Sequence, residues 1–373
     1  MKIGIDARFF GPGSKGLGRY TQKLVTHLED IDHTNQYVIF LRKDNFEAYK
    51  PKNKNFKKVL ADYRWYTLVE QVFFPITLYK ERCDTVHFPH FNVPILYFGK
   101  ILVTIHDLIL LRYPTHKAST HSKIFYKFKF LMYRLVIFNA LSRAKKIIAV
   151  SKFTKDDICK LYKKVCNKID VIYEAAEIKL SEKTDKEIDL KKYGIMNEYI
   201  LYVGNAYPHK NLYTLVDAFA LYLKRGGKAQ NLVLVGRNDY FYDNLRVHIK
   251  QKQIAGIIIL DTVTDEVLYK LYKGALFFVF PSLYEGFGLP PLEAQLLGVS
   301  VLSSEHKCMK EILSEEGALY CDASSKKELA DSMQLLSTDF ELRANLVKIG
   351  LLNAKKYSWQ RMAKETHKKY MEL

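Results

Sequence analysis

The sequence has no run of about 18 apolar residues, the length that a helix needs to span a bilayer. The nearest candidate, FLMYRLVIFNAL, carries Arg134 in its middle. Asp6 and Arg8 stand where a signal peptide would have its apolar segment, so we expect no export by that route. The five cysteines are too few and too scattered for a disulfide framework or a zinc site, and they favour a reducing, cytoplasmic location.

Acidic side chains are scarce in one half of the chain. Residues 1–175 hold 31 basic and 15 acidic side chains, a net charge of +16, whereas the remaining residues hold 27 and 25, a net charge of +2. This asymmetry points to an anionic partner for the first half: a nucleic acid, a membrane surface or an acidic acceptor. The sequence contains no basic–aromatic RNA-binding motif, which argues against nucleic acid.

The 373 residues are enough for two domains, and 48% hydrophobic with 26% charged residues is typical of a globular protein. Short apolar segments alternate with helical patterns, which indicates an α/β fold with parallel sheets. The polar stretch 174–198 separates two such series and is the expected linker. We expect strands at residues 2–7, 37–41, 85–88, 101–107, 146–151, 199–204, 231–236, 256–260, 275–280 and 299–304.

Residues 117–143 are predicted to form a helix. Its periodic apolar face consists of Ile124, Phe128, Leu131, Leu135 and Phe138. Three basic residues at helical spacing, Lys123, Lys127 and Arg134, are interleaved with the aromatic residues Phe125, Tyr126, Phe128 and Phe130. This mixture suits a headgroup boundary, so we expect reversible docking on an anionic membrane. The alternative is that the aromatic rings pack in the core and the basic groups are solvated.

The strongest candidate site follows the predicted strand 275–280, in the segment PSLYEGFGLPPLE. Its prolines stand where a helix begins, so the residues before them, Gly286 to Gly288, should present N–H groups at a helix N-terminus, where phosphate binds. Glu285 and Glu293 suit vicinal hydroxyls, as on a ribose and a sugar. For Glu293, complementing the helix dipole is an equal alternative.

Three further positions could contact a ligand. Lys210 stands at a predicted helix start, where the helix dipole disfavours a cation. Either a bound phosphate explains its position, or it is a solvated surface lysine. His106 ends an apolar strand and either lines the cleft or is structural. The loop 11–18 satisfies GxGxxG, but no acidic residue ends the next strand, so an anion-binding loop or an ordinary flexible loop is favoured over nicotinamide binding.

The seven-residue spacing of Glu285 and Glu293, in the frame PSLYEGFGLPPLEAQLLG, resembles the EX7E motif of retaining GT-B glycosyltransferases of family 4. The segments GIDAR with GLGRY, TIHDL, AVSKFTKDDI, LYVGNAYPHKNL, LVLVG, DTVTDEVLYKLY and YSW follow in the order expected of this family. The pattern most resembles bacterial mannosyltransferases that build O-antigen or capsule. The resemblance implies two Rossmann-like domains facing each other across a cleft, residues 1–175 and 176–350. A C-terminal helix, 351–373, would cross back to the first domain.

The resemblance also implies site roles. Glu293 would hold the ribose of a nucleotide sugar, Glu285 would contact the donor hexose, and His106 would lie near that hexose. The diphosphate would be held by Gly16, Lys210, Gly286, Phe287, Gly288 and Leu289. Thr262 and Val263 would lie near the base.

Two departures from the family pattern affect this site. Relatives commonly carry an arginine near Lys210, where this chain has His209 and Asn205. Either the diphosphate has one cation fewer, or Arg19 or Arg237 takes that role. Relatives also have a glycine at the position of Asp261, before the base-contacting pair.

The implied activity is retaining transfer of a hexose, mannose from GDP-mannose, to a lipid-linked or lipopolysaccharide glycan. No metal or other cofactor is expected, and the enzyme would act in the cytoplasm, at the inner face of the membrane. The alternatives are another donor (UDP-glucose, UDP-galactose or dTDP-rhamnose), a sugar phosphorylase or epimerase on the same fold, and a nucleic-acid-binding protein.

Overall fold

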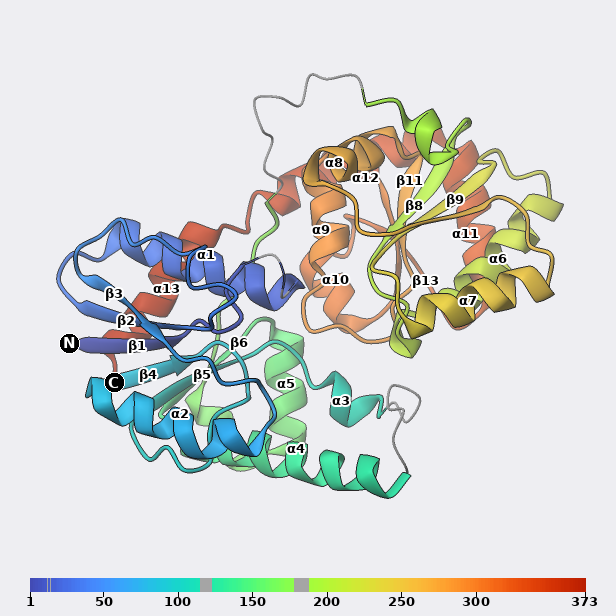
Figure 1. The fold of residues 1–373 in the computed structure, drawn as a ribbon. Coiled ribbons are helices and arrows are strands. Elements are labelled where there is room, and N and C mark those ends of the chain that lie inside the picture. Colours follow the sequence, from blue (N-terminus) through green and yellow to red (C-terminus); the bar gives the residue numbers. More distant parts are fainter. Residues whose placement is uncertain (12, 14, 115–122, 178–187) are drawn as a thin grey trace. The chain divides into compact units, whose positions relative to one another are not determined.

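Two parallel β-sheets, one in each of two units, organise the chain (Figure 1). The computed structural model describes residues 1–373 except 12, 14, 115–122 and 178–187. The first unit comprises Met1–Glu174 and Ser358–Leu373, and the second comprises Ala175–Tyr357. The segment that returns to the first unit therefore begins at Ser358.

The first sheet has seven strands, and its order reverses between β1 and β4. In spatial order the strands are β3 (Phe56–Leu60), β2 (Gln36–Leu41), β1 (Lys2–Asp6), β4 (Thr85–Phe88), β5 (Ile101–Ile105), β6 (Lys146–Ala149) and β7 (Ile169–Val171). All pairings are parallel, and β4 and β5 are buried along their whole length, as expected of strands covered on both faces. The reversal point is where ligands bind in such sheets.

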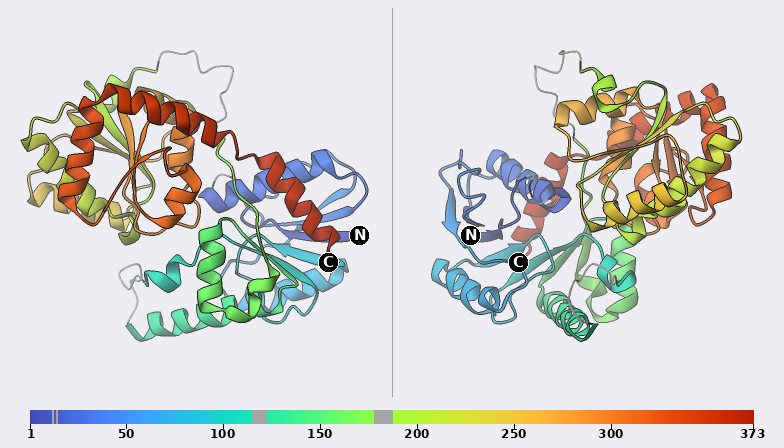
Figure 2. Two further views of the ribbon diagram at one scale, coloured as in Figure 1. Left: turned by 180° about the vertical axis from the view of Figure 1, so that it is seen from behind. Right: turned by 45° about the vertical axis from the view of Figure 1, so that its right-hand side comes forward.

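Helices cover both faces of this sheet (Figures 1 and 2). On one face, α1 (Lys15–Ile31) packs against α13 (Trp359–Met371). On the other, α2 (Leu68–Glu81) contributes Phe74 and α4 (Lys123–Arg143) contributes Ile137 to one buried cluster. The remaining helical elements are α3 (Ile109–Arg112), α5 (Lys152–Leu161) and the 3-10 helix η3 (Lys163–Lys168). Among the described residues, no helix is both long enough and apolar enough to span a bilayer.

The predicted apolar face of α4 is not the face that packs on the sheet. Leu131, Leu135 and Phe138 are 53%, 46% and 55% exposed. The buried side chains are Val136, Ile137, Ala140 and Leu141. The side chains at positions 123–126 and 128, which the membrane-docking prediction also used, lie outside the described part of the chain.

The C-terminal helix α13 is tied to the first unit by buried polar contacts. The Tyr370 hydroxyl lies 2.7 Å from His87 Nδ1, and His367 Nε2 lies 2.8 Å from Asp32 Oδ2. Burial lowers the pKa of His87 to about 3, so this imidazole is neutral at physiological pH. The first unit is thus completed by residues from both ends of the sequence.

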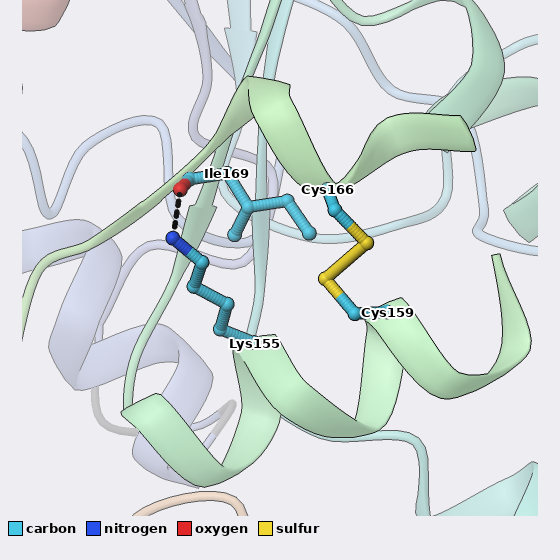
Figure 3. The surroundings of a disulfide bond; sticks show 4 residues. All are labelled: Lys155, Cys159, Cys166 and Ile169. Carbon is cyan, nitrogen blue, oxygen red and sulfur yellow. Dashed lines mark hydrogen bonds between the residues drawn. A yellow bond between two sulfur atoms is a disulfide. The ribbon is translucent and has the colours of Figure 1, made fainter. Parts of the chain in front are cut away.

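One disulfide joins neighbouring elements of the first unit (Figure 3). Cys159 on α5 is bonded to Cys166 on η3, and Lys155 Nζ donates to the Ile169 carbonyl at 2.9 Å beside it. The sequence argument against a disulfide framework did not foresee this single pair. Cys83, Cys308 and Cys321 form no disulfide.

The second sheet has six parallel strands, and its order reverses between β8 and β11. In spatial order they are β10 (Ile257–Leu260), β9 (Asn231–Val235), β8 (Tyr199–Val203), β11 (Phe277–Phe280), β12 (Val301–Ser304) and β13 (Leu319–Cys321). The connecting helical elements are η4 (Leu190–Tyr193), η5 (Pro208–Lys210), α6 (Leu212–Lys224), α7 (Tyr240–Gln251), α8 (Asp265–Gly274), α9 (Leu289–Leu296), α10 (Lys307–Leu313), α11 (Lys326–Thr338) and α12 (Phe340–Ala354).

Candidate active site

Two loops meet where the second sheet reverses its order. Residues 204–211 follow β8, and residues 281–288 follow the adjacent strand β11. The Leu283 N–H donates to the His209 carbonyl at 2.8 Å, and the Ser282 hydroxyl donates to the same oxygen at 3.3 Å. The loop that carries Lys210 is therefore fastened to the loop that carries Glu285.

Lys210 and Glu285 form an ion pair between these loops. The ammonium of Lys210 donates to Glu285 Oε1, which also accepts the Ser282 hydroxyl. The two side chains are only 13% and 9% exposed. This burial does not fit a solvated surface lysine, and the pairing explains how a carboxylate can stand beside a predicted phosphate site, because Lys210 offsets its charge.

The turn after Glu285 needs glycine at its last position. Gly288 has φ +95°, and a Cβ there would lie 2.6 Å from Cε of Met309. Gly288 is the N-cap of α9 and brings no side chain to cap the helix, and the first turn contains Pro290 and Pro291. Helix α9, with the partial positive charge of its N-terminus, thus begins four residues after Glu285.

Glu293 lies in the second turn of α9. The stabilisation of a carboxylate by the helix dipole fades beyond the first turn, and the first turn of α9 contains no acidic residue. The structure therefore does not favour the alternative that Glu293 serves to complement the helix dipole. Glu293 is 5% exposed, and its Oε2 accepts the Tyr272 hydroxyl at 3.2 Å. Tyr272 also lies 3.2 Å from the Pro290 carbonyl, so it fixes the carboxylate relative to the start of the helix.

Thr262 and Val263 lie in the loop between β10 and α8. In this loop Asp261 Oδ1 accepts the N–H of Asn238 at 3.0 Å and of Thr262 at 2.7 Å. These backbone hydrogen bonds lower the pKa of Asp261. The aspartate at the position where relatives have glycine therefore orders the loop and joins it to the loop after β9.

The imidazole of His209 is buried and uncharged at neutral pH. It is 4% exposed, and burial, with the charge of Lys210, lowers its pKa to about 4. Asn205 Oδ1 accepts the Tyr207 N–H at 3.2 Å and carries no charge. Arg237 is exposed on the loop after β9, whereas Arg19 belongs to α1 of the first unit.

His106 belongs to the first unit, directly after β5. Its Nδ1 lies 2.6 Å from Glu174 Oε1, and its Nε2 lies 2.9 Å from the Pro89 carbonyl. Burial lowers the pKa of His106, but the hydrogen bond and charge of Glu174 outweigh burial and raise it. Both partners are acceptors, so the protonated ring can donate a hydrogen bond from each of its nitrogens, and the two contacts fix its orientation. Gly16 is also in this unit, exposed in the first turn of α1.

Sequence reasoning missed three residues that hold the candidates in place. Ser282 binds Glu285, Tyr272 binds Glu293 and Glu174 binds His106. Ser282 stands inside the quoted PSLYEG frame, which could have drawn attention to it. Tyr272 ends the quoted segment DTVTDEVLYKLY, but it and Glu174 are 21 and 68 residues from their partners, so no local pattern shows these two pairings.

Comparisons with known proteins agree with this architecture. Residues 14–179 match the family described as Glycosyltransferase Family 4, and residues 185–351 match Glycosyl transferases group 1. The chain is similar to the O-antigen chain mannosyltransferase RfbU of Salmonella typhimurium, with 27% identity over 87% of each chain. It is 28% identical to the O-antigen chain mannosyltransferase B of Escherichia coli, over 77% of this chain and 74% of that one.

The solved structures support the fold. The HepE protein of Anabaena, in complex with UDP and glucose, matches with a TM-score of 0.76 and 15% identity over the whole of both chains. Two parallel sheets whose strand order reverses give this chain the GT-B fold, as the sequence predicted. The chain belongs to the family 4 glycosyltransferases, whose two family regions together span most of its length.

Proposed function

We propose that this enzyme transfers mannose from GDP-mannose to a lipid-linked or lipopolysaccharide glycan, with retention of the anomeric configuration. The O-antigen mannosyltransferases among its relatives support the sugar and the class of acceptor. The Lys210–Glu285 pair at the N-terminus of α9 is the observation that carries the proposal. In this pair a cation that could bind a diphosphate stands beside a carboxylate that could accept hydrogen bonds from sugar hydroxyls.

Each part of the donor has a proposed partner in the second unit. The diphosphate is held by Lys210 together with the turn of Gly286, Phe287, Gly288 and Leu289. Glu285 accepts hydroxyls of the hexose once Lys210 turns to the diphosphate. Glu293, held by Tyr272, accepts the ribose hydroxyls, and Thr262 and Val263 contact the base. From the first unit, Gly16 approaches the diphosphate and His106 approaches the hexose.

The proposed step breaks the bond between the sugar C1 and the β-phosphate oxygen. A bond forms on the same face between C1 and an acceptor hydroxyl oxygen, and the hydroxyl proton passes to the departing phosphate. The leaving nucleoside diphosphate gains negative charge, which Lys210 and the N-terminus of α9 stabilise. Because these groups supply the positive charge, the proposed step uses no divalent metal. We place the reaction in the cytoplasm, at the inner face of the membrane.

A thermal-shift screen of the purified protein tests the donor. GDP-mannose, UDP-glucose, UDP-galactose and dTDP-rhamnose are compared, since a ligand that binds the native state raises its apparent stability. We expect GDP-mannose to give the largest shift. A larger shift with another nucleotide sugar would replace the proposed donor, and a product with an inverted anomeric centre by NMR would reject retention.

Substitution of Glu285 tests the site. We expect Glu285→Ala to lower the transfer rate at least about 100-fold, which corresponds to about 2.7 kcal/mol, while the fold is retained. Glu316→Ala, which removes an exposed glutamate of the same unit, is the matched control and should leave the rate unchanged. A rate within about twofold of wild type for Glu285→Ala would remove this residue from the site.

A further inference from the structure

Helix α2 is apolar on both of its faces. Phe74 and Leu78 point into the core of the first unit and are fully buried. The opposite face, here called the α2 face, also consists of large apolar side chains. They are Leu68 (79% exposed), Val69 (54%), Val72 (46%), Phe73 (50%), Ile76 (58%) and Tyr79 (47%). A helix that is apolar all round is normally covered on all sides, so the α2 face needs a partner.

The neighbouring loop extends this apolar surface. Leu96 is 48% and Phe98 71% exposed. The Phe98 N–H donates to the Tyr79 hydroxyl at 2.6 Å, which holds the loop against the end of α2. The guanidinium of Arg143, from α4, lies 4.7 Å from the centre of the Phe98 ring. The α2 face therefore continues into a fixed loop with a cation at its edge.

Within residues 64–82 the exposed charges are all basic. Of the exposed residues in this range, seven are apolar or aromatic and the other three are Arg64, Lys80 and Arg82. The two carboxylates of this segment are turned inward: Glu70 is fully buried against Arg8, and Glu81 is 14% exposed and paired with lysines. The nearest exposed carboxylates lie outside the segment and have partners, Asp62 with Arg42 and Asp84 with the Lys2 N–H. An apolar strip whose own exposed charges are basic is complementary to acyl chains beneath anionic headgroups.

We propose that the α2 face docks the first unit on an anionic lipid surface. The apolar side chains enter the boundary between headgroups and acyl chains, and the three basic residues contact the headgroups. The net charge of +16 over residues 1–175 adds a longer-range attraction. The proposal rests on the proposed function insofar as the acceptor is lipid-linked.

A second copy of the chain fits this surface less well. In a two-fold symmetric dimer the same patch meets itself, so Arg64, Lys80 and Arg82 of both copies would be brought together. Like charges at such an interface oppose association. A bilayer offers the opposite charge and a continuous apolar layer.

Vesicle sedimentation with the full chain tests the proposal. Vesicles of phosphatidylglycerol and phosphatidylcholine are compared with vesicles of phosphatidylcholine alone. The variant Val72→Gln/Phe73→Gln/Ile76→Gln changes only exposed side chains of α2, and thermal unfolding checks its fold. The control, Phe340→Gln/Leu352→Gln, changes equally exposed apolar side chains on α12 of the second unit, which are 72% and 60% exposed.

We expect wild type to bind the anionic vesicles, and more weakly at high salt. The α2 variant should lose at least about tenfold in partition coefficient, which is about 1.4 kcal/mol, and the control should stay within about twofold. Equal binding by wild type and the α2 variant, or an equal loss in the control, would overturn the proposal. The variant Lys127→Glu/Arg134→Glu tests the segment that the sequence favoured, and a loss confined to that variant would move the docking surface to α4.

Two further measurements distinguish membrane docking from self-association, and failure of the docking proposal from failure of the proposed function. Sedimentation velocity without lipid should give the same mass for wild type and the α2 variant, whereas a wild-type dimer and a monomeric variant would assign the face to self-association. Sugar transfer to a water-soluble acceptor glycan should be equal in both proteins. If no nucleotide sugar is used at all, the proposed function fails, while the vesicle result still decides the role of the α2 face.

Discussion

Both units place a basic side chain near the point where a parallel sheet reverses, but they surround it differently. In the first unit, Arg8 follows β1 and is 1% exposed. Its guanidinium donates to Asp6 at 2.7 and 2.8 Å, is paired with Glu70 at 2.7 Å and lies 3.9 Å from the centre of the Phe74 ring. In the second unit, Lys210 has one carboxylate partner, Glu285, and remains 13% exposed.

The difference distinguishes a structural ion cluster from the proposed binding site. Arg8 is shared by two carboxylates and covered by an aromatic ring, so exchanging its partners for a ligand would leave two buried charges uncompensated. Lys210 has a single carboxylate partner, and we propose that it exchanges this partner for the diphosphate of the donor. A basic residue at a sheet reversal is therefore a ligand site only where its partners can be released.

Arg8→Met should give the largest effect. We expect the free energy of unfolding of the first unit to fall by about 3–5 kcal/mol, because Asp6 and Glu70 remain buried without a cation. Both tryptophans of the chain, Trp65 and Trp359, belong to this unit, so tryptophan fluorescence in urea reports its unfolding alone.

The triple variant Arg8→Met/Asp6→Asn/Glu70→Gln is the matched control. It removes all three charges and should recover most of the loss, since no unpaired charge is then buried. If Arg8→Met is as stable as wild type, then Arg8 contributes no more to the stability of the first unit than Lys210 does to that of the second.

Lys210→Met should lower activity and leave the stability of the first unit unchanged, the reverse of what we expect for Arg8→Met. We expect sugar transfer to fall about 100-fold, or about 2.7 kcal/mol, because the leaving diphosphate loses its cation. Fluorescence-detected unfolding should be unchanged, since the residue lies in the other unit. Unchanged donor affinity together with unchanged turnover would reduce Lys210 to a structural residue, and the comparison with Arg8 would fail.

A smaller, pH-dependent effect is expected for Glu174→Gln. The pKa of His106 is raised in the folded protein by its hydrogen bond and ion pair with Glu174. The ion pair therefore contributes its full stabilisation at pH values below the ordinary pKa of about 6.5. This contribution is lost as the pH rises through the raised pKa of the folded protein. The variant should be less stable than wild type by about 1–2 kcal/mol near pH 6, with the gap closing at alkaline pH. Urea unfolding followed by fluorescence measures it, and a gap independent of pH would contradict the assignment.

Much of the second unit could be predicted because its signals are local. The strand before Glu285, the glycines and the prolines stand within one short segment, and together they determine a turn and a helix start. The same locality explains why Lys210 was found, since it stands in its own strand–loop–helix sequence. The pairing of Lys210 with Glu285 joins residues 75 apart and has no such signal.

Edge strands and helix faces were harder to predict. The edge strand β3, FKKVL, carries two lysines, so it lacks the apolar run that revealed the central strands. The edge strands β7 and β13 have three residues each, which is too short for a pattern. In α4 there are two apolar stripes, and periodicity alone cannot tell which of them meets the sheet. The sequence identified the stripe that contains Leu135, whereas the stripe that contains Ile137 is the buried one.

The return of α13 to the first unit determines the order in which the enzyme can be completed during synthesis. The second unit is continuous in sequence, so its chain is entire once Tyr357 has been added. The first unit must wait for His367 and Tyr370, which follow the end of its main segment, Glu174, by about 195 residues. At 5–20 residues per second, that interval is roughly 10–40 s.

During that interval the sheet of the first unit stands without the helix that packs beside α1. His87 and Asp32, which contact α13 in the finished protein, then still lack those partners. A ribosome stalled before Ser358 would thus hold a second unit whose sequence is complete, joined to a first unit that is not. Such nascent chains are where chaperone binding should concentrate, since incomplete units expose apolar surface.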